Sequence, residues 1–308
     1  MERESFIYKP KIVVIGSCNT DMVVKAGRLP VPGETVLGGP FYMNPGGKGA
    51  NQAIAAARLG AEVTLISKIG YDLFGLQALE IYRSEKINTE FIFTDQKSPS
   101  GVALISVDSY GENSIIVAPG ASRSLSTEDI DKAKSKLEEA DIILMQLEVP
   151  IETVEYAATI AKSYGKKVIL NPAPASVLSN SFLSCVHTIL PNRIEAEMLS
   201  GIKVIDEESA WRAAKAIGEK GIENVVITLG KDGAYVKEKE EYTMIPAKEV
   251  ETIDTTGAGD VFCGAFSVYL SENHTLTESV EFANAAAALA VTRMGAQSAI
   301  PYKREIAL

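Results

Sequence analysis

Short runs of apolar, mostly β-branched residues alternate with longer amphipathic segments along most of the chain. The apolar runs predict strands at residues 11–16, 63–66, 142–147, 168–170, 188–190 and 225–228. The amphipathic segments predict helices at residues 49–59, 72–86, 126–139, 151–164, 194–200, 207–220 and 261–270. Because the strands lack polar alternate positions, both of their faces should be covered. The pattern therefore predicts an α/β fold with a mostly parallel central sheet and helices on both faces.

Two stretches break this alternation because they contain strands without intervening helices. They are residues 35–37, beside Gly38 and Gly39, and the series 91–93, 102–107 and 114–117. We expect them to form a small antiparallel sheet that closes over a ligand as a lid. An extension of the main sheet is the alternative. Since no linker or repeat is found, we expect one domain, residues 1–308, with lid strands inserted at about 20–45 and 91–120.

Composition narrows the class of protein. The 308 residues are 46% hydrophobic and 23% charged, which suits a globular chain, and the net charge of -10 argues against nucleic acid as a partner. Residues 1–10 lack the apolar core of a signal peptide, and no apolar run reaches the length of a membrane span. We therefore expect a soluble, cytoplasmic protein with no membrane partner.

The cysteines and histidines of the chain do not indicate a metal site or a nucleophilic catalytic site. The chain has three widely spaced cysteines with no C-x-x-C pair, and only two histidines. No serine or cysteine lies in a nucleophile elbow. Catalysis is therefore expected to depend on carboxylates, lysines and backbone groups.

Residues 254–260, Asp-Thr-Thr-Gly-Ala-Gly-Asp, place small residues and a carboxylate where a helix begins. Backbone N–H groups of Gly257, Ala258 and Gly259, together with the positive end of the helix dipole, could bind a phosphate. A carboxylate at Asp260 would repel that anion unless it takes a proton from an attacking hydroxyl. The alternative is an ordinary helix cap, for which aspartate and glycine are both common.

Residues 44–52 form a second glycine-rich loop that opens a helix. The loop is not a Walker A motif, because Gly49 follows Lys48 where serine or threonine is required. Residues 257–259 likewise fail as a dinucleotide fingerprint, since Phe262 occupies the third glycine position. Asn51 can donate to and accept from hydroxyls, so the loop suits a polyol. The alternative is a tight turn with a solvated Lys48.

Together, residues 46–53 and 254–260 resemble the two signatures of the ribokinase family of sugar and nucleoside kinases. Further similar stretches extend along the whole chain, at residues 16–21, 32–35, 145–148, 171–175, 191–197, 228–233 and 291–297. The resemblance implies ATP-dependent phosphorylation of D-ribose at O5, with Asp260 as general base and residues 257–259 as the anion hole. The alternatives are a kinase for fructose, fructose phosphate or a nucleoside, and a catalytically silent sensor.

The resemblance also implies roles for individual residues. Those expected to bind the sugar are Asn19, Thr20, Asp21, Gly47, Lys48, Asn51, Glu148 and Asp260. Those expected to bind ATP are Asn192, Thr228, Leu229, Gly230, Lys231, Asp232, Gly233, Gly259 and Asn284. Glu195 is expected to hold Mg²⁺ through water.

Two further features follow from the same resemblance. A monovalent cation, K⁺, is expected to be bound by Asp254, Thr256, Ala290, Arg293, Gly295 and Ala299. Alanine at position 299 lacks the hydroxyl that a serine would supply there. A homodimer that pairs through exposed lid strands is also expected.

Overall fold

Nine strands form one sheet at the centre of the computed structural model, which describes residues 8–110 and 112–307. Residues 1 and 308, the predicted limits of the domain, lie outside this part of the chain. In spatial order the strands are β13 (Glu241–Ile245), β12 (Ala234–Glu238), β11 (Asn224–Thr228), β10 (Thr188–Ile189), β9 (Lys167–Leu170), β8 (Ile142–Met145), β1 (Lys11–Ile15), β4 (Glu62–Gly70) and β5 (Ile92–Asp95). From β11 to β5 all neighbours are parallel, whereas β11, β12 and β13 pair antiparallel. The mostly parallel central sheet is confirmed.

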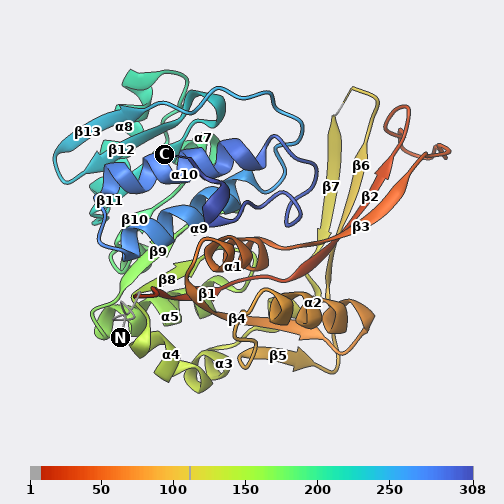
Figure 1. Cartoon of the computed structure of the whole chain (residues 1–308), viewed down its shortest axis with the longest axis horizontal. Coiled ribbons are helices and arrows are strands. Elements are labelled where there is room, and N and C mark those ends of the chain that lie inside the picture. Colours follow the sequence, from red (N-terminus) through yellow and green to blue (C-terminus); the bar gives the residue numbers. More distant parts are fainter. Residues whose placement is uncertain (1–7, 111, 308) are drawn as a thin grey trace, which may run out of the picture.

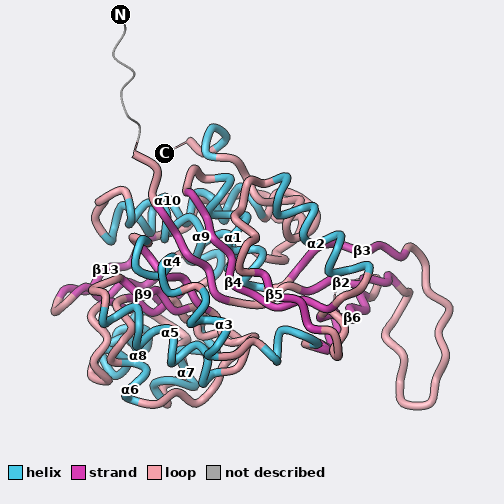
Figure 2. Tube along the Cα trace, turned by 90° about the horizontal axis from the view of Figure 1, so that it is seen from below, coloured by secondary structure: helices cyan, strands magenta, loops and turns pink. Residues whose placement is uncertain are grey.

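Helices cover both faces of this sheet. They are α1 (Lys48–Arg58), α2 (Leu73–Ser84), α3 (Thr127–Lys132), α4 (Lys134–Glu139), α5 (Ile151–Ser163), α6 (Asn180–Leu183), α7 (Arg193–Ser200), α8 (Glu207–Gly218), α9 (Ala258–Ser271) and α10 (Leu276–Ala290), with 3-10 turns η1 (Gly120–Ser124), η2 (Gly230–Asp232) and η3 (Lys303–Glu305). Ile12 and Val14 belong to one buried cluster, whereas Val13 and Ile15 belong to the other. Figure 2 shows α1, α9 and α10 on one side of the sheet and α3, α5, α7 and α8 on the other. Among residues 8–110 and 112–307, no helix has the length and apolar character needed to cross a bilayer.

A second sheet of four strands extends away from the first (Figure 1). In spatial order its strands are β3 (Phe41–Gly46), β2 (Asn19–Lys25), β6 (Gly101–Val107) and β7 (Asn113–Ala118). A separate small sheet is thus confirmed, but it is mixed instead of antiparallel. Its outer pairs are antiparallel, whereas β2 and β6 run in the same direction.

Two runs predicted for the small sheet lie elsewhere. Residues 35–37 form no strand, and Leu37 is 92% exposed in the segment between β2 and β3. Residues 92–95 form β5, which pairs parallel with β4 at the edge of the large sheet. The reason is topological, because helix α2 connects β4 to β5 and completes a βαβ unit. The second insertion into the small sheet therefore begins at Gly101 and not near residue 91.

The observed helices differ from the prediction most clearly at residues 126–139 and in α10. The segment 126–139 contains two helices, because Ala133 adopts a non-helical φ of -100° between α3 and α4. Helix α10 and the hairpin of β12 and β13 lie outside the predicted elements. Helix α10 is buried around most of its circumference and contains a run of alanines, so it lacks the polar face that gives a helical period.

Helices α1 and α9 pack directly against each other through small residues. In α1 the buried face includes Ala53, Ala55 and Ala56, and Gly264 of α9 lies against it. A Cβ atom added to Gly264 would lie 2.6 Å from the Cβ of Ala55. Because both contact surfaces are small, the two backbones approach closely and their first turns lie side by side.

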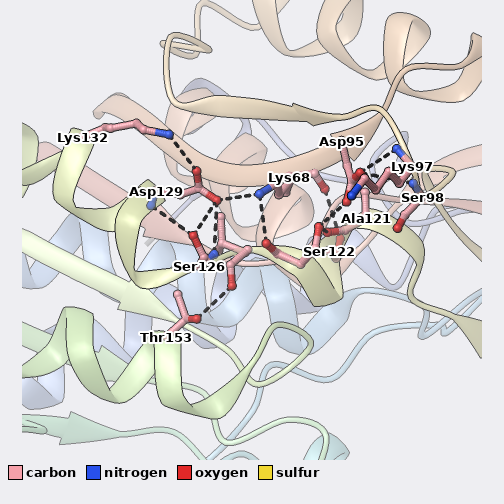
Figure 3. Close-up of polar contacts among 12 residues, drawn as sticks. Lys68, Asp95, Lys97, Ser98, Ala121, Ser122, Ser126, Asp129, Lys132 and Thr153 are labelled. Carbon is pink, nitrogen blue, oxygen red and sulfur yellow. Dashed lines mark hydrogen bonds and ion pairs between the residues drawn. The ribbon is translucent and has the colours of Figure 1, made fainter.

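A polar cluster connects the base of the small sheet to the large one (Figure 3). Lys68 of β4 donates to the carbonyl of Ser124 at 3.0 Å and forms an ion pair with Asp129 of α3 at 2.8 Å. Ser124 lies in η1, directly after β7, and its hydroxyl donates to Asp95 of β5 at 2.6 Å. The Lys68 and Asp129 side chains are only 17% and 6% exposed, so loss of one partner would leave a poorly hydrated charge. The segment after β7 is therefore fixed to the large sheet.

Candidate active site

A cavity of about 130 Å³ lies between the first turn of α9 and the carboxyl ends of β9, β10 and β11. Ligands of open α/β sheets bind at this edge. The residues that line it are Lys48, Asn171, Ala173, Leu190, Asn192, Glu195, Thr228, Gly257, Gly259, Asp260 and Cys263. The structure thus brings residues from both predicted motifs, 209 positions apart at Asn51 and Asp260, to one place.

The first turn of α9 presents backbone N–H groups to this cavity. Gly257 has the left-handed φ of 75° that favours glycine, and it turns the chain into the helix. The N–H of Ala258 donates to the Thr255 carbonyl at 3.2 Å. Within the described part of the chain, the N–H groups of Gly257 and Gly259 donate to no protein acceptor. A Cβ atom added to Gly259 would meet no atom within 4 Å, so packing does not require glycine there.

Asp260 is 7% exposed and accepts two side-chain hydrogen bonds. The amide of Asn51 donates to Oδ2 at 2.9 Å, and the amide of Gln52 donates to Oδ1 at 3.0 Å. Burial raises the pKa of Asp260, while the Lys48 ammonium and the two amides oppose that rise. The carboxylate therefore has the character of a base whose proton affinity is above that of a solvated aspartate.

Lys48 faces a group of carboxylates at the start of α1. The preceding Gly47 has a φ of 89°, and a Cβ atom there would lie 2.7 Å from the Asn19 nitrogen. The Lys48 N–H donates to Glu148 at 3.1 Å, and Ser17 donates to the same oxygen. Attraction to Asp260 raises the pKa of Lys48, so the side chain is a cation.

Asp21 lies beside the same loop, since a Cβ atom at Gly46 would be 2.4 Å from its carboxylate. Burial, and then repulsion by Glu148 and Asp260, raises the pKa of Asp21 to about 6. Asn19, at the start of β2, is also buried, and in the described part of the chain its Oδ1 has no hydrogen-bond partner. An unpaired buried acceptor is costly, so a hydroxyl donor would be favourable here. Thr20 follows Asn19 on β2.

The residues predicted to bind ATP lie on several elements. Asn192 caps α7 and exchanges hydrogen bonds with Glu195, whose two carboxylate oxygens accept from the Asn192 backbone and side chain, each at 2.8 Å. Asn192, Glu195 and Thr228 line the cavity, and η2 carries Gly230, Lys231 and Asp232 between Leu229 and Gly233. Asp232 forms an ion pair with Arg193 at 2.7 Å. Asn284 of α10 donates to the carbonyls of Ile245 and Pro246 and does not line the cavity.

Two of the residues predicted to bind a monovalent cation, Thr256 and Gly295, contact a third, Asp254. One carboxylate oxygen accepts from the N–H and hydroxyl of Thr256, and the other accepts from the N–H of Gly295 at 2.9 Å. Burial opposes ionisation, but these hydrogen bonds outweigh it and lower the pKa of Asp254. The Ala290 carbonyl accepts from the N–H of Arg293, and Ala299 donates its N–H to Ala296. Their roles stay predictions.

Several residues around the cavity are absent from the predicted site. Asn171 follows β9 and Leu190 follows β10, positions where a residue reaches the ligand edge of a parallel sheet. Cys263 lies three positions after Asp260 and shares its helix face. Those two signals could have identified them. Gln52 gives no such signal, because its importance depends on a contact with Asp260 that only the fold creates.

The sequence profile of the pfkB family carbohydrate kinases matches residues 9–303. The chain belongs to this family. The carbohydrate kinase is 46% identical over 294 residues to ribokinase of Haemophilus influenzae, with 96% of each chain covered, and 38% identical over 291 residues to deoxyribokinase of Salmonella typhimurium, with 94% and 95% covered. Among solved structures, that of Arabidopsis thaliana ribokinase complexed with ribose and ATP has a TM-score of 0.88 and 30% identity, covering 96% and 97%.

Proposed function

We propose that this carbohydrate kinase transfers the γ-phosphoryl group of ATP to O5 of D-ribose. The observation that carries the proposal is the juxtaposition of a buried carboxylate, Asp260, with the unpaired N–H groups of Gly257 and Gly259 at one cavity. The 46% identity to the Haemophilus ribokinase, and the complex of the Arabidopsis enzyme with ribose and ATP, support ribose as the sugar.

In the proposed mechanism, Asp260 accepts the proton of the 5-hydroxyl as the sugar oxygen attacks the γ-phosphorus. The bond from that phosphorus to the bridging oxygen breaks, and ADP leaves. The N–H groups of Gly257 and Gly259, with a contribution from Ala258, stabilise charge on the transferring group. The sugar is held by Asn19, Asp21, Lys48, Asn51 and Glu148. Their neighbours in sequence, Thr20 and Gly47, complete the same side of the sugar site.

We propose that Mg²⁺ is held mainly by ATP phosphates and water. The described residues contain no cluster of three or more histidine, cysteine, aspartate or glutamate side chains suited to a metal, and both oxygens of Glu195 already accept hydrogen bonds. Contact through water suits this ion, which retains part of its hydration shell. The cation neutralises phosphate charge. ATP is proposed to lie along Asn192, Thr228 and residues 229–233, with Asn284 toward its adenine end.

We propose that K⁺ binds beside Asp254, whose ionised carboxylate accepts hydrogen bonds from Thr256 and Gly295, and that backbone carbonyls of Ala290, Arg293, Gly295 and Ala299 complete the site. Its expected effect is activation, because the site adjoins the turn that leads into α9. Omitting K⁺ and then Mg²⁺ from the assay tests both cations. If removal of K⁺ or of Mg²⁺ leaves the activity unchanged, that result contradicts the proposed role of the cation removed.

The small sheet is proposed to act as a lid and as a dimer interface. Exposed apolar side chains on its strands, including Phe41, Met43, Leu104, Ile115 and Ile116, offer a surface for a second copy. A light-scattering mass of one chain at assay concentration would contradict the dimer. We also propose a cytoplasmic location, since the three cysteines are free and ATP is a cytoplasmic substrate.

Measuring ADP release with D-ribose, 2-deoxy-D-ribose, D-fructose and adenosine tests the function. We expect the highest kcat/KM with ribose, at least about tenfold above 2-deoxyribose, because a site built for a hydroxyl leaves polar groups unpaired when it is missing. The Salmonella deoxyribokinase makes 2-deoxyribose the second candidate. A higher kcat/KM with 2-deoxyribose than with ribose would indicate deoxyribokinase activity. Release of ADP with none of the four compounds would favour a catalytically silent sensor.

Ribose affinity is expected to fall in acid because of Asp21. Its carboxyl pKa of about 6 lies above the usual value, so the group becomes protonated as the pH falls through 6 and loses its charge and part of its capacity to accept from sugar hydroxyls. The KM for ribose should therefore rise between pH 7 and 5. Asp21→Asn should have a raised KM that depends little on pH over this interval. Parallel pH profiles of KM in the two proteins would contradict the assignment.

A further inference from the structure

A set of buried side-chain amides surrounds Asp260, and apart from Asn51 its members have no proposed contact with sugar or ATP. Gln146 donates to Oε1 of Gln52 at 2.5 Å, and Gln52 donates to both Asp260 and Asn171. On the other oxygen of Asp260, Asn51 donates to the carboxylate and accepts from Gln297 at 3.0 Å. Gln52 and Gln146 are completely buried.

The direction of every hydrogen bond in this set is fixed by groups that can only accept. An ionised carboxylate has no proton to donate, so the nitrogen of Gln52 must face Asp260 and its oxygen must face Gln146. At the far end, Asn171 donates to the carbonyl of Leu190 at 3.1 Å, so its oxygen must face Gln52. Gln146 in turn must present its nitrogen to Gln52. The whole arrangement is therefore complementary to an ionised Asp260.

Packing holds Gln146 in this orientation. A Cβ atom at Gly16 would lie 2.0 Å from Oε1 of Gln146, so the glycine leaves room for the amide and little more. In the described part of the chain, this Oε1 has no hydrogen-bond partner. An unpaired buried oxygen costs stability. Orientation of Gln52 is a function that would account for keeping Gln146 here.

Other charged groups near Asp260 act in both directions. Lys48 favours the ionised form, whereas Glu148 opposes it, and Asp21, Glu195 and Cys263 are further acidic groups around the same site. One lysine thus faces several acids. Neutral amide donors can stabilise the ionised form of Asp260 without adding a charge that would repel or trap a substrate.

We propose that Gln52 is a positioning residue that directs the Asp260 carboxylate toward the cavity in its ionised form, and that Gln146 acts through Gln52 by fixing the orientation of its amide. This inference rests on the proposed role of Asp260 as the base. It gives functions to two glutamines that need not touch either substrate.

Gln52→Met, which keeps the side-chain length and removes the donor, is the principal test. Loss of a hydrogen bond to a charged group should raise the pKa of Asp260, so the acid limb of the kcat profile should move to higher pH by about one unit. At pH values on the acid limb, kcat should fall by about tenfold, and it should recover at higher pH. The KM for ATP should change little.

Gln146→Met should displace the acid limb in the same direction by a smaller amount. The double variant should match Gln52→Met alone, because Gln146 acts only through Gln52. Equal and independent losses in the two single variants would contradict this dependence. Thr153→Val is the matched control, since it removes a buried hydrogen bond to Leu125 at 2.8 Å in the region of Figure 3. It should lower Tm and leave the pH profile unchanged.

A readout without sugar separates this inference from the proposed function. The Asp260 ¹³Cγ resonance, assigned by its loss in Asp260→Asn, should titrate at higher pH in Gln52→Met than in the parent protein. If the protein does not phosphorylate ribose but Gln52→Met still raises the pH at which Asp260 titrates, the proposed substrate is wrong and the positioning role stands. An unchanged titration midpoint, or a kcat lowered by the same factor at every pH, would overturn the positioning role.

Discussion

Asp260→Asn is expected to reduce kcat by about 10²- to 10⁴-fold, the usual contribution of a positioned general base. Asparagine keeps the size of the side chain but cannot take the proton of the attacking hydroxyl. Its nearest partners, Asn51 and Gln52, remain in place on α1, so the sugar site should persist. Steady-state kinetics should show the loss in kcat, and calorimetry should show ribose and ATP affinities within a few-fold of the parent values.

Two controls make this result interpretable. Circular dichroism and Tm establish that the variant folds, because a buried carboxylate that accepts two hydrogen bonds also contributes to packing. Asp141→Asn alters a carboxylate remote from the cavity and should leave kcat unaltered. A kcat near that of the parent protein in Asp260→Asn would remove Asp260 from the role of base.

Lys48→Met is expected to lower kcat/KM for ribose by about 10²- to 10³-fold, as removal of a charge-stabilising group in an active site does. The Lys48 cation faces Asp260, Glu148 and Glu195, and without it the carboxylates repel one another with less compensation. The pKa values of Asp260 and Glu195, which Lys48 now lowers, should rise, so activity should require a higher pH. Methionine preserves most of the aliphatic chain, which limits the change to the charge.

The pH profile of kcat/KM distinguishes this effect from simple loss of a sugar contact. Loss of a sugar contact alone would lower kcat/KM by the same factor at every pH, whereas loss of the Lys48 cation should also move the acid limb to higher pH. Lys203→Met, at an exposed position, is the matched control and should behave like the parent protein. A uniformly lowered curve for Lys48→Met would contradict the electrostatic role.

The sequence could nominate residues whose proposed role depends on their own side chain or backbone, but not those whose proposed role depends on a neighbour. Lys48 and Asp260 lie in the first turns of helices that follow glycine-rich loops, and such loops indicate ligand binding from the sequence alone. The strands of the parallel sheet were predictable for a similar reason, since each is a short apolar run. Residues 91–93 were misplaced because an edge strand of the large sheet and a strand of the small sheet have the same local pattern.

The buried amides around Asp260 illustrate why the other residues of the site could not be predicted from the sequence. Gln52, Gln146 and Asn171 come from α1, the end of β8 and the end of β9, and no local pattern relates them. Their hydrogen-bond directions depend on Asp260 and on the Leu190 carbonyl. The division of the small sheet into parallel and antiparallel pairs likewise depends on long-range pairing that strand propensity does not encode.

The close contact of α1 and α9 gives residues without reactive side chains an influence on the geometry of the proposed site. Gly264 lies one turn beyond Asp260 and, with Ala55, sets how near the two helix axes can come. A larger side chain there would separate the loop at residues 44–52 from the Asp260 carboxylate while leaving both motifs intact. The substitutions that this helix contact tolerates are therefore limited by the proposed catalytic alignment as well as by folding.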